Sequence, residues 1–500
     1  MVLRKKSKLV REVRDGKVIY TFSTDAVNDS GPAPALSLAQ GEGSLSGTSS
    51  QMVTLLVSAA AIGVALGCGW FGYEALINPD VSVWINQFLP TVNPSRSGTT
   101  TAQTPEQIQL SLQSQGSTPG DRLILSTQPD LLLPLLTHPP ECQDCPQQIS
   151  ELRVYRALQI PPLLQLFQTQ RHFRLLERQS VVGPSAEDLI APEWMTRPNR
   201  ATPTPLLPLT QIQPYLASPS TGGTWLHLSG VQAHDSGRIA YGQILYFDPQ
   251  RPRLQRLLSW QSSTGEIPQW QQRDQAPAEL VVDQSLGLEP HFDIYQLAPG
   301  LNHSFQLELL NLGRPAFANA DFEQSLQLAR SGLWSTALLL LNHVKQQYPQ
   351  YWSTLAQSQL EAIRLHAQVT QRQAEQPALN PSDRLIALLI NGSWQAALAL
   401  YEASPGDRAA MHSVLESHGG GLMQRVEAAL SLNPVQTEII AEPAEATITW
   451  GALILTAQQG QGEAATWLSK RVAKNSPTYT RIQDLAESLI SVTVDGSASD

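Results

Sequence analysis

The spacing of apolar and polar residues divides the chain into three kinds of segment. One stretch near the N-terminus is apolar without interruption, residues 121–300 carry short apolar runs between polar turns, and residues 316–490 carry apolar residues at helical spacing. These patterns are typical of a membrane span, of β-strands and of α-helices, respectively. The sequence therefore predicts a multi-domain fold: a single transmembrane helix, then a mainly antiparallel β domain and an α-helical domain.

Residues 52–73 are the predicted transmembrane helix. No charged residue occurs between Glu42 and Glu74, and a helix over residues 52–73 would span about 33 Å, enough for a bilayer core. Trp70 and Tyr73 lie at its C-terminal edge, where aromatic rings favour the headgroup region. The membrane lipid bilayer is thus a predicted partner of the chain.

Three small residues within this segment, Ala59, Gly63 and Gly67, recur every four positions. Small residues at that spacing let a second helix approach closely, so they indicate self-association through the transmembrane helix. The alternative is that glycine and alanine are simply common in membrane spans.

The basic residues predict the orientation of the chain. Seven of them fall within the first seventeen positions, whereas Arg96 is the first to follow the apolar segment. The positive-inside rule then keeps the N-terminus in the cytoplasm and places the later domains in the periplasm, or in a thylakoid lumen if the host has internal membranes. Residues 1–51 are too long for the start of a cleaved signal peptide, which favours an uncleaved signal anchor.

The segments around the predicted span are expected to be small or flexible. Residues 1–22 form a basic cytoplasmic segment, in which Asp15-Gly16 supplies the turn of a hairpin. Residues 23–51 and 91–120 are rich in small and polar residues and are predicted to be flexible linkers.

Residues 121–300 are predicted to form an antiparallel sandwich or open barrel, because short strands alternate with polar turns. The proline-rich residues 202–219 are expected to form a surface loop, and residues 159–170 a helix. The predicted strands are Arg122–Ser126, Leu152–Leu158, Phe173–Val182, Thr224–Val231, Ile239–Phe247, Arg253–Gln261, Glu279–Asp283 and His291–Leu297.

Residues 316–490 contain an internal repeat, followed by a tail at 491–500 that is predicted to be disordered. The sequence LARSGLWSTALLLL from Leu328 is matched sixty residues later by LLINGSWQAALALY from Leu388. The shared positions are Gly332 and Gly392, Trp334 and Trp394, Ala337 and Ala397, and Leu338 and Leu398. Glycine permits a left-handed turn between two helices, alanine permits close helix contact, and tryptophan fills the corner.

These positions resemble the second half of a tetratricopeptide repeat. Gly332, Ala337, Leu341, Val344 and Pro349 match that pattern, and a weaker copy contains Gly460, Ala465 and Pro477. The sixty-residue spacing departs from the regular repeat, so hairpins with extra helices between them are expected. The resemblance implies a helical surface that binds proteins; the alternative is that the hairpins only pack a helical domain.

Composition narrows the classes of function. The formal net charge is −10, and after Lys17 the chain contains only three lysines. An acidic body does not attract nucleic-acid phosphates, so no nucleic-acid partner is expected.

Cys142 and Cys145 are the clearest candidates for chemistry. Their spacing suits a structural disulfide in an exported compartment, with free cysteines, a redox pair or a metal site as alternatives. Cys68 is the only other cysteine, so a four-cysteine zinc site is excluded. No cofactor and no metal are expected.

No catalytic motif is found, and the chain is predicted not to be an enzyme. His234, Asp235 and Ser236 are adjacent, whereas catalytic triads assemble from distant positions. The sequence therefore favours a membrane-anchored scaffold or assembly factor that binds envelope or membrane proteins through residues 316–490. The alternative is an exported glycan- or peptide-binding protein that uses aromatic residues of the β domain, namely Trp225, Trp260, Trp270, Tyr241 and Tyr246.

Overall fold

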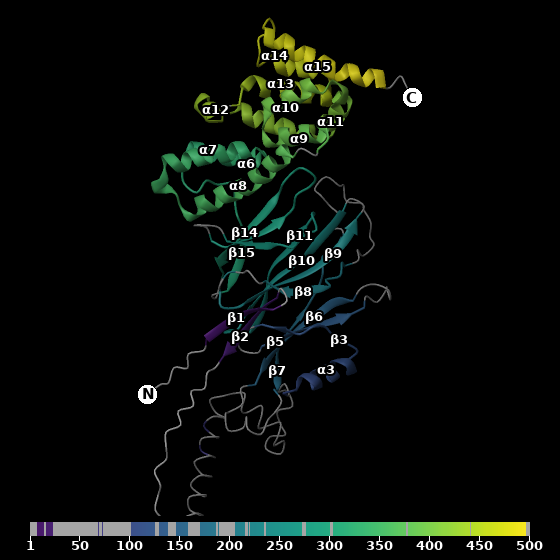
Figure 1. Ribbon diagram of the computed structural model, residues 1–500, viewed down its shortest axis with the longest axis vertical. Coiled ribbons are helices and arrows are strands. Elements are labelled where there is room, and N and C mark those ends of the chain that lie inside the picture. The colour runs from purple at the N-terminus through teal and green to yellow at the C-terminus, as the bar shows by residue number, and fades with distance from the viewer. Residues whose placement is uncertain are drawn as a thin grey trace, which may run out of the picture. The chain divides into compact units, whose positions relative to one another are not determined.

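A computed structural model describes residues 8–14, 17–23, 69, 73, 102–125, 130–138, 147–158, 171–186, 189, 206–215, 219, 221–234, 237–272, 277–300, 304–376, 379–440 and 442–496 (Figure 1). The chain divides into two compact units, Met1–Ile77 and Asn78–Asp500. In the first unit, β1 (Lys8–Arg14) and β2 (Lys17–Ser23) pair as antiparallel strands, with Arg14 opposite Lys17. Asp15 and Gly16, the predicted turn, lie outside the described residues.

The predicted transmembrane helix requires a correction. Among the residues that the structure describes, no helix combines the length and the apolar character that crossing a membrane demands. A span needs about 20 consecutive apolar residues, whereas the longest described helices carry charged residues along their exposed faces. Of residues 52–73, only Gly69 and Tyr73 are described, both in helical conformation, and Ala59, Gly63 and Gly67 lie outside the described residues.

The second unit contains antiparallel strands, which form three sheets within the described residues. In the first sheet the strand order is β3-β5-β6-β7, and β4 also pairs with β5. In the second sheet the order is β8-β9-β10-β11, and in the third it is β12-β13-β14-β15. The strands are β3 (Thr118–Pro119), β4 (Leu123–Ile124), β5 (Leu131–Thr137), β6 (Gln148–Ala157), β7 (Phe173–Ser180), β8 (Gln211–Pro214), β9 (Thr224–His234), β10 (Gly237–Asp248), β11 (Arg253–Ser262), β12 (Gln269–Gln271), β13 (Glu279–Asp283), β14 (Phe292–Pro299) and β15 (Phe305–Leu309).

A helix occupies part of the predicted linker 91–120. Helix α3 (Pro105–Ser114) begins with a capping box, in which Thr104 and Gln107 each bond the other's backbone N–H. Its buried residues Ile108 and Leu112 pack on the first sheet. The segment is helical because its cap is satisfied locally and its apolar face is buried.

Strand β5 was not predicted, because Pro134 interrupts a run of leucines without alternation. The structure shows why a proline is tolerated there. On one side of β5, β4 pairs with Leu131 and Leu132, and β3 pairs with Leu135 and Leu136. Pro134 lies in the gap between these two pairings, so the N–H that proline lacks is not needed by either of them.

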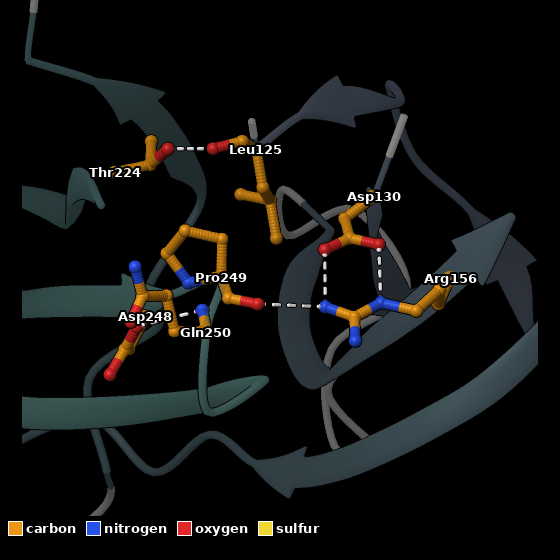
Figure 2. Close-up of polar contacts among 7 residues, drawn as sticks. All are labelled: Leu125, Asp130, Arg156, Thr224, Asp248, Pro249 and Gln250. Carbon is orange, nitrogen blue, oxygen red and sulfur yellow. Dashed lines mark hydrogen bonds and ion pairs between the residues drawn. The ribbon is translucent and has the colours of Figure 1, made fainter. Parts of the chain in front are cut away.

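Buried polar contacts connect the first sheet to the second (Figure 2). Asp130, which is 1% exposed, accepts two hydrogen bonds from Arg156 of β6 at 3.0 and 2.9 Å. The same guanidinium donates to the carbonyl of Pro249, which follows β10, at 3.0 Å, and Thr224 of β9 donates to the carbonyl of Leu125. The bidentate pair with Asp130 fixes the Arg156 guanidinium in place. Its single bond to Pro249 and the bond from Thr224 to Leu125 then join the first sheet to the second.

Helices follow the strands, coloured green to yellow in Figure 1. An antiparallel β region followed by a helical region is thus the architecture of the second unit. The helices are α6 (Ala320–Arg330), α7 (Trp334–Gln347), α8 (Thr354–Glu375), α9 (Pro381–Asn391), α10 (Trp394–Ala403), α11 (Arg408–Leu430), α12 (Pro434–Ile440), α13 (Ala444–Gln459), α14 (Gln461–Ser469) and α15 (Pro477–Gly496), with short 3₁₀ turns at Pro349–Tyr351 and Pro405–Asp407. The last helix extends into residues 491–500, where a disordered tail was expected.

Candidate functional site

The repeated glycines lie at the turns of helical hairpins. Gly332 separates α6 from α7 with φ of +83°, Gly392 separates α9 from α10 with φ of +80°, and Gly460 separates α13 from α14 with φ of +85°. Trp334 and Trp394 are the first residues of the following helices, and Ala337 and Ala397 are fully buried. Ala465 is half-buried on α14.

The first two hairpins contact each other through the second turn. Ser335 of α7 and Thr370 of α8 both donate to the side-chain oxygen of Asn391, at 2.6 and 3.0 Å. A Cβ on Gly392 would lie 3.1 Å from a methyl carbon of Leu333, so the turn approaches the start of α7 closely. The second turn therefore packs against α7 and α8, and the two hairpins form one helical layer.

A cavity of about 970 Å³ lies where this helical layer meets the third sheet. The β side contributes the β13–β14 loop, the start of β14 and the segment after β15. The helical side contributes the α6–α7 turn together with residues of α8 and α11. We call this space the junction cavity. Its size falls within the range of about 300–1,000 Å³ that is typical of ligand sites.

Arg425 of α11 connects three elements at the edge of the junction cavity. This residue is 5% exposed; it pairs with Glu289 of the β13–β14 loop and donates to the carbonyl of Gly332 at 3.4 Å. A buried guanidinium needs such partners, because an unpaired charge out of water is costly. Arg425 therefore connects the α6–α7 turn and the β13–β14 loop to α11.

His366 of α8 forms a second connection between the sheet and the helices. Its Nε2 accepts from the backbone N–H of Phe292 at 3.0 Å, and its Nδ1 lies 2.8 Å from the carbonyl of Ala362. The ring stacks on Trp334, with centroids 3.9 Å apart. Burial lowers the pKa of His366 to about 4. The histidine is therefore neutral, with its proton on Nδ1 and Nε2 as the acceptor.

The other charged side chains that line the junction cavity differ in how they are paired. His291 and Asp293 lie 3.5 Å apart, and the hydrogen bond to Asp293 raises the pKa of His291. Arg330, in the last turn of α6, has no hydrogen-bond or ion-pair partner among the described residues. The same cavity is also lined by apolar groups, which include Trp334, Phe292 and Leu309.

Substitution of Gly332 tests how tightly the α6–α7 turn is packed. A Cβ at this position would lie 2.4 Å from an Nη atom of Arg425. We expect Gly332→Ala to lower the free energy of unfolding by about 2–3 kcal/mol, about 1 of which comes from the positive φ. Gly116, with φ of +73° after α3, serves as the control, because a Cβ added there would have no other atom within 4 Å. In urea denaturation, Gly116→Ala should lower the free energy of unfolding only by the contribution of the positive φ. Equal losses for Gly332→Ala and Gly116→Ala would show that contact with Arg425 does not add to the cost.

The remaining predicted site residues do not join the junction cavity. Cys142, Cys145, Asp235 and Ser236 lie outside the described residues. The aromatic residues of the β domain pack in its interior and are not on its surface. Four of them are at most 6% exposed, and Trp270 is half-buried, with its ring edge-on to that of Trp225. The four are Trp225, Trp260, Tyr241 and Tyr246. Their rings offer no exposed face on which a sugar could stack.

Sequence reasoning missed Glu289, Arg330, His366 and Arg425. One signal was available for Arg425 and His366: each is a polar residue among apolar neighbours on a helix, which often marks a buried polar contact. Their partners were not detectable, because they lie on other elements far along the chain. Within the described residues, no group of three or more His, Cys, Asp or Glu is arranged to hold a metal ion.

No family model matches this sequence, and comparisons with curated proteins and with solved structures find no significant match. The function is therefore inferred from the residues and from their geometry.

Proposed function

We propose that this protein is a scaffold or assembly factor that binds other proteins through its C-terminal helical region, with the junction cavity as the contact site. One observation carries the proposal: a cavity of about 970 Å³ is lined jointly by the α6–α7 turn, α8, α11 and the third sheet. Sites that bind small molecules or peptide segments are commonly concave and lie where two structural regions meet.

The construction of the cavity wall supports binding rather than catalysis. Apart from Arg330, the titratable groups that face the cavity are held in pairs or buried as neutral species: Arg425 with Glu289, His291 with Asp293, and His366 between Phe292 and Ala362. Such groups hold a surface in one shape, and a pre-organised surface loses less entropy when a partner binds. The exposed side chain of Leu309, at 55% exposed, would be covered by that partner.

A matched pair of glycines on α11 provides the test. Gly421 lines the junction cavity, whereas the adjacent Gly420 does not line it and has no atom within 4 Å of its Cβ position. Both are exposed helical positions, so a tryptophan at either one is expected to leave the fold intact. Only Gly421→Trp places a large side chain at the cavity.

The experiment is affinity purification of the full-length protein from its native host, read by quantitative mass spectrometry. We expect a discrete set of proteins that copurifies with the wild type and with Gly420→Trp, and that falls at least fivefold with Gly421→Trp. The proposal fails if no discrete set copurifies, or if both variants retain or lose the same proteins equally.

A further inference from the structure

The proposed function leaves open what chemical group the junction cavity recognises. We infer that it binds an acidic peptide segment of a partner, whose carboxylate pairs with Arg330 while a neighbouring apolar side chain contacts Trp334 and the wall beside it. This inference rests on the proposed function, because it names the chemistry of the same site.

The charge balance of the cavity points to an anion. Among the lining residues, the negative groups Glu289 and Asp293 are already paired with Arg425 and His291. Arg330 is the lining cation that has no partner in the described part of the chain. Binding of a carboxylate would leave every charged group at the cavity with a counter-charge.

Arg330 is exposed to solvent, and its guanidinium lies at the cavity. One of its Nη atoms lies 3.7 Å from the Cβ position of Gly313, which also lines the cavity. Gly313 belongs to the segment after β15, so the guanidinium reaches from α6 toward the β side of the cavity. The planar guanidinium presents two parallel N–H donors, a geometry that matches the two oxygens of a carboxylate.

The remainder of the wall selects a peptide rather than a small anion. Trp334 is 9% exposed and held flat by His366, and Phe292, Ile294 and Leu310 lie on the opposite side. An apolar side chain next to the acidic residue would contact this wall and contribute through burial of apolar surface. The formal net charge of the whole chain is −10, so the protein as a whole repels an acidic segment. An unpaired arginine at the cavity attracts such a segment locally.

The test is selection of a phage-displayed library of random heptapeptides on the full-length protein, followed by fluorescence anisotropy of the peptides selected. We expect an aspartate or glutamate beside an apolar residue in the selected peptides. Arg330→Gln should weaken binding at least tenfold, and replacing the acidic residue of the peptide by its amide should weaken it equally. Combining the two changes should add no further loss, as expected for groups in direct contact.

Arg372→Gln is the matched control. Arg372 also lies in the last turn of a helix, α8, but does not line the cavity; it therefore reports any effect of removing a cation from a helix C-terminus. Selected peptides without acidic residues, or acidic peptides that bind Arg330→Gln as tightly as the wild type, overturn the inference and leave the proposed function standing. If no selected peptide loses its binding to the Gly421→Trp variant, both the inference and the proposed function are overturned.

Discussion

Arg425→Met is expected to lower the free energy of unfolding by about 2 kcal/mol and to loosen the junction between the sheet and the helices. The substitution removes the guanidinium of a side chain that is 6% exposed, so Glu289 and the carbonyl of Gly332 lose their hydrogen-bond donor. Loss of one partner of a fully buried pair costs about 3–5 kcal/mol. The expected loss for Arg425→Met is smaller than this range, because the side chain of Glu289 is 41% exposed and is hydrated by water when its partner is removed.

Arg481 on α15 is the matched control for Arg425. It also bridges separate helices, through Glu402 at 2.7 Å and Glu445 at 3.5 Å, but all three side chains are about half exposed. Exposed ion pairs contribute between about 0 and 1 kcal/mol. Urea denaturation followed by tryptophan fluorescence should therefore show a clear shift for Arg425→Met and a small one for Arg481→Met. Similar shifts for both would show that Arg425 does not hold the junction.

The strands that the sequence predicted well are those that lie between clear turns. Residues Glu279–Asp283 are a strand with the predicted bounds, and β9, β10 and β11 contain the predicted segments and extend a few residues beyond them. Among these four strands, β11 has buried and exposed positions roughly in alternation, whereas β10 and β13 have successive buried residues, so the turns on either side and the β-branched and aromatic residues mark these strands better than alternation does. Strand β5 was missed because Pro134 interrupts its run of leucines, and a proline argues against a strand interior.

The turns of the helical hairpins could be located from the sequence, whereas the junction cavity could not. A glycine at a helix end carries local information, since only glycine adopts positive φ without strain. The contact between Glu289 and Arg425 joins residues 136 positions apart, and that between Phe292 and His366 joins residues 74 positions apart. Nothing in either local sequence specifies the partner, because such contacts depend on how the helical layer is placed on the sheet.

Acidification is expected to destabilise the wild-type protein more than a variant that lacks His366. The pKa of His366 is lowered by burial from 6.5 to about 4. Between these values the unfolded chain takes up a proton that the folded protein does not bind, so the free energy of unfolding falls as the pH decreases through this window and is unaffected by this group above it. From pH 7 to pH 5 the expected loss from His366 is about 2 kcal/mol.

The physical cause of this sensitivity is the acceptor role of Nε2. Protonation there would convert the acceptor for the Phe292 N–H into a second donor, so the bond between β14 and α8 would be lost. Other charges near the ring act in opposing directions: His291 disfavours its protonation, while Asp283 and Asp293 favour it. Burial outweighs them, because the imidazole is 3% exposed and lies between Trp334 and Phe292.

His366→Gln isolates this contribution, since glutamine retains a hydrogen-bonding amide but does not titrate. Urea denaturation of both proteins at pH 7 and pH 5 should show a loss that is about 2 kcal/mol larger for the wild type. The carboxylates and His291, whose raised pKa acts in the opposite direction, are present in both proteins and cancel in the difference. The protection of the Phe292 amide from hydrogen exchange, measured relative to its intrinsic rate at each pH, should also be lower at pH 5 than at pH 7 in the wild type. An equal loss of stability in the two proteins would mean that His366 is protonated in the folded state near its usual pKa, and that the contact with Phe292 does not depend on its neutral form.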